Sequence, residues 1–205
     1  ANMKGKSNGS TPRALHGKYT AVSLFTGAMG LDIGLEQTGR FKTIACVEVE
    51  LAFCETIRRN RDAGRLSNKR MKVYQADIMR LSPTRVLRDS NIKPGELDLL
   101  VGGPPCQSFS TAGRRGTVQD SRGTLIWQFL RYVKVIRPRF FLMENVRGLL
   151  SAALRHRPIK GRPEHGGPRL SPDEEPGSVV RLFADDLHAI GYRFDCFLVN
   201  AVNYG

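Results

Sequence analysis

Short apolar runs alternate with segments of helical periodicity along most of this chain, and that alternation limits the fold more than any other feature. Strands are expected at 21–25, 43–47, 72–75, 97–101 and 140–143. Helices are expected at 27–37, 50–60, 83–89 and 125–136, the first with Leu31, Gly34 and Leu35 on one side. Strands that alternate with helices form a parallel sheet covered on both faces, so the sequence predicts an α/β fold.

The two ends of the chain and one internal segment depart from this pattern. Residues 1–18 are polar and basic and are interpreted as a flexible lead-in, with Ala1 and Asn2 as a cloning remnant. Residues 155–177 carry five prolines and are interpreted as a mobile inserted loop. A helix at 178–190, capped by Ser178, and a strand at 194–202 are expected to complete one domain over 19–205.

The charge balance indicates the class of partner. Lys and Arg number 32 against 19 Asp and Glu, a net charge of +13, which favours an anionic partner and nucleic acid first. No apolar run approaches the roughly 20 residues of a membrane helix. The cysteines at 46, 54, 106 and 196 form no C-x-x-C pair, so no metal is expected, and their spacing favours a reducing cytoplasm.

Polar residues follow four of the expected strands at their carboxyl ends, where ligands bind in open parallel sheets. They are Glu48, Asp77, Cys106 and Glu144. Cys106 lies in a turn of two glycines and two prolines, which would place its thiol rigidly. An inert buried cysteine is the alternative. Cys106 and Glu144 end neighbouring strands, so they suggest covalent catalysis by sulfur assisted by a carboxyl group.

A glycine-rich turn at 25–32 follows the first expected strand and would let the backbone approach a ligand. Glu48 could hold a ribose and Asp77 an adenine amino group, although a solvated strand-end acid and a helix cap are the alternatives. The dinucleotide pattern G-x-G-x-x-G is absent. S-adenosylmethionine therefore fits these residues better than NAD. Residues 108–124, with Arg122, could form a lid that contacts phosphates.

These residues, in this order, resemble the motifs of the DNA (cytosine-5) methyltransferases. The resemblance rests on the turn 25–30, the acids Glu48 and Asp77, the Pro-Cys segment 104–107, and the segments 120–125, 144–146 and 200–205. It implies a Rossmann-like, S-adenosylmethionine-dependent methyltransferase fold acting on DNA. Cys106 would add to carbon 6 of a flipped cytosine, Glu144 would contact the ring at N3 and its amino group, and carbon 5 would receive the methyl group.

The same resemblance implies roles for further residues. The cofactor would contact Phe25, Gly27, Gly30, Glu48, Val49, Asp77, Ile78 and Leu125. The nucleic acid would contact Gln107, Ser108, Ser110, Arg122 and Asn145, with Asn145 orienting the pocket rather than reacting.

Three departures from the family pattern qualify this interpretation. Met29 stands where a glycine is usual and could narrow the turn, and residues 155–177 are an extra loop. The arginine-bearing motif, the recognition domain and the final motif of the family are not in the sequence. We therefore expect activity to depend on a C-terminal part or a separate subunit, and an apolar surface near the first helix. A tRNA methyltransferase and a non-catalytic regulator remain alternatives.

Overall fold

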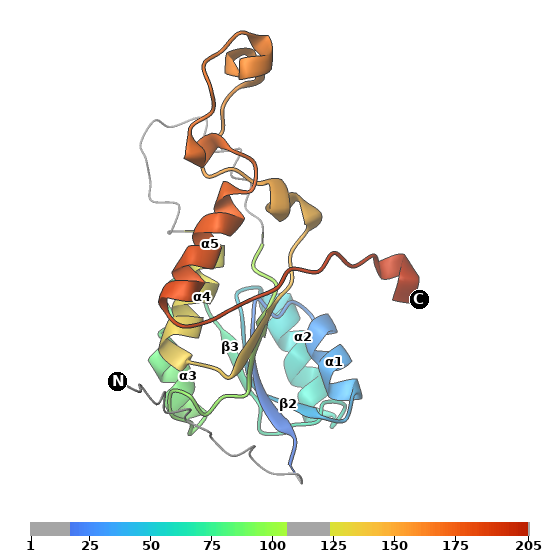
Figure 1. The fold of residues 1–205 in the computed structure, drawn as a ribbon. Helices are drawn as coiled ribbons and strands as arrows, with labels where there is room; N and C mark the ends of the chain where they lie inside the picture. The colour runs from blue at the N-terminus through green and yellow to red at the C-terminus, as the bar shows by residue number, and fades with distance from the viewer. Residues whose placement is uncertain (1–16, 106–123, 205) are drawn as a thin grey trace, which may run out of the picture.

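A five-stranded parallel sheet forms the centre of the molecule (Figure 1), as the computed structural model shows for residues 17–105 and 124–204. Its strand order is β3-β2-β1-β4-β5, and every neighbouring pair is parallel. The strands are β1 (Tyr19–Leu24), β2 (Phe41–Glu48), β3 (Lys72–Gln75), β4 (Leu99–Gly102) and β5 (Phe140–Met143). The order reverses between β1 and β4, and this reversal is the position at which such sheets open a crevice for ligands.

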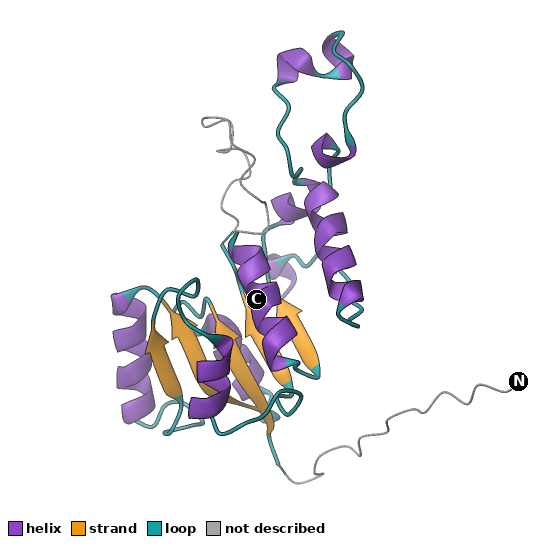
Figure 2. Ribbon diagram, turned by 90° about the vertical axis from the view of Figure 1, so that its left-hand side faces the viewer, coloured by secondary structure: helices purple, strands orange, loops and turns teal. Residues whose placement is uncertain are grey.

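Helices cover both faces of the sheet (Figure 2). They are α1 (Gly30–Gln37), α2 (Leu51–Asp62), α3 (Pro83–Asp89), α4 (Leu125–Ile136) and α5 (Ser178–Ala189). The chain passes through α1 and α2 on its way outward to β3, and through α3 and α4 on its way to β5. The predicted α/β fold is confirmed, and the bounds of β3, α3, α4 and β5 agree with those expected from periodicity.

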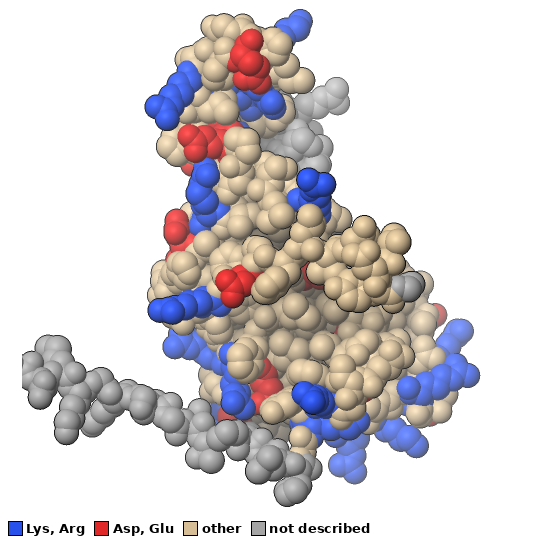
Figure 3. Space-filling model, turned by 45° about the vertical axis from the view of Figure 1, so that its right-hand side comes forward, with Lys and Arg blue, Asp and Glu red and all other residues tan. Residues whose placement is uncertain are grey.

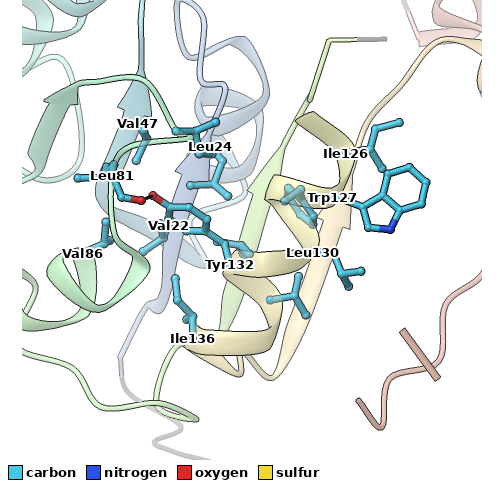
Figure 4. Packing of buried hydrophobic residues seen from close by; sticks show 14 of the residues in the cluster. Val22, Leu24, Val47, Leu81, Val86, Ile126, Trp127, Leu130, Tyr132 and Ile136 are labelled. Carbon is cyan, nitrogen blue, oxygen red and sulfur yellow. Dashed lines mark hydrogen bonds between the residues drawn. The ribbon is translucent and has the colours of Figure 1, made fainter. Parts of the chain in front are cut away.

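The main core lies between the sheet and the α3–α4 layer (Figure 4). Val22 and Leu24 of β1 and Val47 of β2 pack there against α4, whose buried side chains include Phe129 and Tyr132. A smaller cluster on the opposite face joins Met29, Cys46, Ile57, Leu66 and Met71. Alternate residues of the central strands thus serve two cores, which explains why these strands are apolar on both faces.

Two expectations for the first strand and helix were wrong in part. β1 ends at Leu24 because Phe25 has a left-handed φ of 54°, which no strand continues. In α1, Leu31 and Gly34 are exposed and only Leu35 packs inward, while Asp32 is the buried residue. The buried face of α1 is set by the hydrogen bonds that Asp32 accepts from Ser23 and Thr43 of the sheet rather than by apolar periodicity. Leu31 and Ile33 are exposed on α1.

The inserted segment 155–177 projects from the body at the top of Figure 1 and contains three 3₁₀ turns, Ile159–Gly161, Pro163–His165 and Pro172–Glu174. Arg157 forms a two-pronged ion pair with the buried Glu174 and donates to the carbonyls of Pro168 and Arg169. Donation from the Ser171 backbone and from Arg157 lowers the pKa of Glu174 to about 2. The segment therefore has defined internal contacts rather than those of a featureless loop.

The C-terminal expectations need two corrections. The helix α5 is capped by Gly177 with a φ of 81°, while the Ser178 hydroxyl donates to the Asp173 carbonyl and accepts from the Leu154 N–H. No strand forms at 194–202 within the described part of the chain, because the alternating residues there find no strand to pair with. Phe194 still packs edge-to-face on Phe183. None of the described helices is both long and apolar enough to cross a membrane.

Gly102 gives a test of this packing. It pairs with Leu24 across β1 and β4, and a Cβ there would lie 2.5 Å from the Leu24 carbonyl oxygen. We expect Gly102→Ala to lower the free energy of unfolding by about 1–3 kcal/mol, measured by urea denaturation. Gly34→Ala is the matched control, because its Cβ would meet nothing within 4 Å and a helical alanine should add up to about 1 kcal/mol. Equal stabilities would contradict the packing described here.

Candidate active site

The carboxyl edge of the sheet collects the polar residues that the sequence singled out. Glu48 is the last residue of β2, Asp77 follows β3 by two residues, and Glu144 directly follows β5. Gly103 continues from β4 beside Glu144, since a Cβ on Gly103 would lie 3.1 Å from a Glu144 carboxylate oxygen. Parallel strands end at one edge of the sheet, so the expected placement of Glu48, Asp77 and Glu144 at the carboxyl ends of strands is confirmed.

The turn between β1 and α1 is built from alternating left-handed residues. Phe25, Gly27 and Met29 have φ values of 54°, 54° and 72°. Such angles are costly for Phe and Met, and residues held this way concentrate at functional sites. A Cβ on Gly27 or Gly30 would meet nothing within 4 Å, so the turn has open space beside its backbone.

Met29 does not narrow this turn as the sequence suggested. Its side chain is 1% exposed and packs with Cys46 and Ile57 in the smaller core. The thioether therefore points into the protein, and the burial of this side chain offsets the strain of its backbone.

The Glu48 carboxylate ties the turn to the end of β2. One of its oxygens accepts the Gly27 N–H at 2.7 Å, and the other accepts the N–H groups of Val49 at 2.7 Å and Glu50 at 2.9 Å. A carboxylate offers about four acceptor positions, so about one remains for a ligand hydroxyl. Glu48 is thus a structural clamp as well as a candidate ligand.

Asp77 heads a tight turn that leads to α3. Its carboxylate accepts the Met79 N–H at 2.8 Å, and its carbonyl accepts the N–H groups of Arg80 and Leu81. The side chain stays 45% exposed beside Arg80, so it both caps the turn and faces solvent. The two interpretations left open for Asp77, a cap and a ligand, are therefore compatible.

Arg131 of α4, which the sequence analysis did not single out, forms hydrogen bonds with the turn after Asp77. Arg131 donates from one guanidinium nitrogen to the carbonyls of Ile78 and Leu81, and the hydroxyl of Tyr132 donates to Leu81 at 3.0 Å (Figure 4). The guanidinium also lies 5.4 Å from the centre of the Tyr132 ring. A lone arginine among the apolar positions of a buried helix is the signal that could have identified it.

The other expected cofactor residues lie at the same edge in different environments. Val49 is exposed beside Glu48. Ile78 packs in the core, and it is the Ile78 carbonyl that Arg131 binds. Leu125 is half-buried at the start of α4.

Asn145 connects β5 to the segment that leads to Cys106. Its amide nitrogen donates to the Pro104 carbonyl at 2.8 Å, and its amide oxygen accepts the Val146 N–H at 2.9 Å. Pro104 itself is buried. The Pro-Cys segment is therefore fixed two residues before the cysteine, next to the exposed Glu144. Cys106, Gln107, Ser108, Ser110 and Arg122 lie outside the described residues.

A buried carboxyl group lies behind the turn. Asp32 of α1 accepts the Ser23 hydroxyl at 2.8 Å and the Thr43 hydroxyl at 3.4 Å, so it joins α1 to both β1 and β2. Burial raises the pKa of Asp32 to about 6, against the smaller opposing effect of the Ser23 bond. Within the described residues no group of His, Cys, Asp and Glu side chains is arranged to hold a metal ion.

Asp32 makes stability depend on pH. Its pKa is raised in the folded state, so its contribution is greatest below about pH 4 and is lost as the pH rises through about 6. Asp32→Asn keeps the shape without the charge and should raise the free energy of unfolding by about 2 kcal/mol at pH 8, with a smaller gain at pH 4.5. Urea denaturation across this range measures it, with the exposed Asp185→Asn as control. A gain independent of pH would refute the assignment.

The role of Arg131 is testable by removing its donors. Arg131→Met keeps the aliphatic stem but leaves the Ile78 carbonyl unpaired, which should cost about 1–3 kcal/mol of unfolding free energy. Hydrogen exchange at the Arg80 and Leu81 amides should also become faster in this variant. Arg131→Lys, which keeps a donor, should recover part of the stability and part of the protection from exchange. Arg85→Met, on the exposed surface of α3, is the control. Unchanged exchange in Arg131→Met would show that the turn holds without this residue.

Comparison with known proteins identifies the family. Residues 19–205 match the family model of the C-5 cytosine-specific DNA methylases. The Type II methyltransferase M.AquIA of Picosynechococcus sp. is 41% identical over 130 residues, which cover 63% of this chain and 49% of that protein. Type II methyltransferase M1.HphI of Haemophilus parahaemolyticus is 32% identical over 188 residues, covering 91% of this chain and 42% of that protein.

A crystal structure of Schizosaccharomyces pombe Dnmt2 methyltransferase covers 64% of this chain and 36% of its own, with 18% identity and a TM-score of 0.44. The chain spans less than half of the length of the curated relatives named above. Because the family model matches from β1 to the end of the sequence, the chain belongs to the C-5 cytosine-specific DNA methylase family.

Proposed function

We propose that this chain carries the catalytic machinery of a DNA (cytosine-5) methyltransferase, with S-adenosylmethionine as the methyl donor. The observation that carries the proposal is the placement of Glu48, Asp77 and Glu144 along the carboxyl edge of one sheet, in a chain that matches the family over 19–205. Asn145 and Pro104 fix the segment that leads to Cys106 at the same edge.

The residues of the first half fit an adenosine-containing cofactor. The open side of the Gly27 turn leaves room for a ligand against the backbone. The remaining acceptor position of Glu48 would take a ribose hydroxyl, and the exposed carboxylate of Asp77 would take an adenine amino group. Phe25 and Val49 would line the adenine site with apolar surface, and Leu125 would bound it on the α4 side. Bound there, S-adenosylmethionine supplies an electrophilic methyl group.

The residues of the second half would act on the base. The Cys106 thiolate would form a bond to carbon 6 of a flipped cytosine while Glu144 holds N3 and the amino group, so that electron density moves to carbon 5. Once carbon 5 has gained the methyl group, with S-adenosylhomocysteine as the by-product, loss of its hydrogen to solvent as a proton would break the carbon–sulfur bond and free the Cys106 thiolate. Asn145 is a positioning residue, because it binds Pro104 rather than the reacting atoms. Gln107, Ser108, Ser110 and Arg122 would contact the DNA.

A trapping experiment tests the proposal. A duplex containing 5-fluorocytosine cannot lose the atom at carbon 5 as a proton. A covalent adduct should therefore accumulate when S-adenosylmethionine and the C-terminal part on which activity is expected to depend are both present. Cys106→Ser should reduce adduct formation by more than about 10³-fold, read on a denaturing gel. Binding of S-adenosylmethionine, followed by calorimetry, should be unchanged.

Cys196→Ser, at an exposed cysteine far along the chain, is the matched control and should form the adduct normally. An adduct of normal yield in Cys106→Ser would remove the assignment of the nucleophile. Failure of the unmodified chain to bind S-adenosylmethionine would overturn the cofactor assignment itself.

A further inference from the structure

Nearly half of the excess positive charge of the chain lies in 15 residues that the proposed chemistry does not use. We name as the α2 basic patch the residues Arg58, Arg59, Arg61, Arg65, Lys69, Arg70 and Lys72. Asp62 is the acidic residue within 58–72, so seven positive charges less one give +6, against +13 for the whole chain. Figure 3 shows Lys and Arg gathered on the lower right of that view, on the side of the molecule where α1 and α2 lie.

The patch is a built surface rather than a loose run of charge. After α2, Gly64 turns the chain with a φ of 73°, and Leu66 and Asn68 are buried beneath the following loop. The Asn68 amide donates to the Thr43 carbonyl of β2 at 2.9 Å. Arg61 donates to the Met71 carbonyl at 3.0 Å and so ties the end of the helix to the end of the loop. These contacts anchor the backbone of the loop that carries Arg65, Lys69 and Arg70.

Few acidic side chains compensate this charge. Glu55 lies 3.9 Å from Arg59, and Asp62 lies 2.8 Å from Arg61. Glu36 of α1 reaches the loop too, but it accepts the backbone N–H groups of Ser67 and Thr43. Among the described residues, the remaining members of the patch have no ion pair. They are Arg58, Arg65, Lys69, Arg70 and Lys72.

The patch also lies apart from the candidate active site. α2 begins three residues after Glu48, at the carboxyl edge, and runs 12 residues to Asp62. At 1.5 Å per residue the helix separates its two ends by about 18 Å. Lys72 begins β3 and Arg61 lies in the last turn of α2, so these parts of the patch lie toward the amino edge of the sheet.

We propose that the α2 basic patch binds the phosphate backbone of duplex DNA at a position separate from the target base. A fixed cluster of uncompensated Arg and Lys is complementary to the dense, regular charge of a duplex. The choice of DNA among anionic partners rests on the proposed function. Such a contact carries no base information, and it would keep the protein on long DNA while target sites are searched.

The experiment compares two triple variants of equal charge. Arg65→Gln, Lys69→Gln and Arg70→Gln together remove exposed, unpaired members of the patch. Arg85→Gln, Lys93→Gln and Lys134→Gln together remove the same charge outside the patch. All three residues are exposed, Arg85 on α3, Lys134 on α4 and Lys93 in the loop after α3. Binding of a 30-base-pair duplex of adenine and thymine alone is measured against salt, because that duplex holds no cytosine for the active site.

The patch variant should weaken this binding by about 10-fold or more at low salt and reduce the slope of log affinity against log salt by about 2–3. The control variant should change both far less. Equal losses in the two variants, or none in either, would overturn the proposal. Tighter, patch-dependent binding of duplex RNA or of polyglutamate than of the DNA would overturn the choice of partner. Circular dichroism confirms folding, and S-adenosylmethionine binding reports separately on the proposed function.

Discussion

The organisation of the candidate site depends on one carboxylate. Glu48 accepts three backbone N–H groups, from Gly27 in the β1–α1 turn and from Val49 and Glu50 after β2. It thereby holds two neighbouring strand ends together at the point where a ligand would lie. The turn it holds carries left-handed Phe25 and Met29, a conformation that persists only when surrounding contacts enforce it. Two contacts enforce it here: the Met29 side chain is buried in the smaller core, and the Glu48 carboxylate accepts the Gly27 N–H.

The second half of the site is organised by equivalent means. Gly102 lets β4 lie directly against the Leu24 carbonyl, and Asn145 binds Pro104 from the end of β5. On the α4 side, Arg131 and Tyr132 reach across to the turn after Asp77. Each functional segment is thus fastened by a polar side chain to backbone groups of a neighbouring segment. A hydrogen bond depends on direction as well as distance, so it restricts the conformation of a turn more narrowly than apolar packing does.

Much of this could be predicted because the signals are local. The apolar run 140–143 predicted β5 and the helical periodicity of 125–136 predicted α4, both with the observed bounds. Such patterns mark which side chains are buried, and they are read from neighbouring residues alone. The expectations failed where a distant partner decides the outcome. The alternating residues 194–202 resemble a strand, but a strand exists only with a neighbour to pair with. The face of α1 was misjudged because Ser23 and Thr43 draw a carboxylate inward against the usual preference for apolar residues.

By itself, the sequence determined the alternation of strands and helices, the placement of acids at strand ends and the membership of the family. These follow from periodicity, which is local, and from the order of motifs along the chain. Only the tertiary structure decided that Glu48 clamps the glycine turn, that Met29 points inward, and that Arg131 holds the turn after Asp77. It also showed that the α2 basic patch lies on the end of α2, the anchored loop after it and the start of β3, away from the carboxyl edge. These features depend on contacts between side chains that are distant in the sequence. Tertiary packing brings such side chains together, and their spacing along the chain does not predict it.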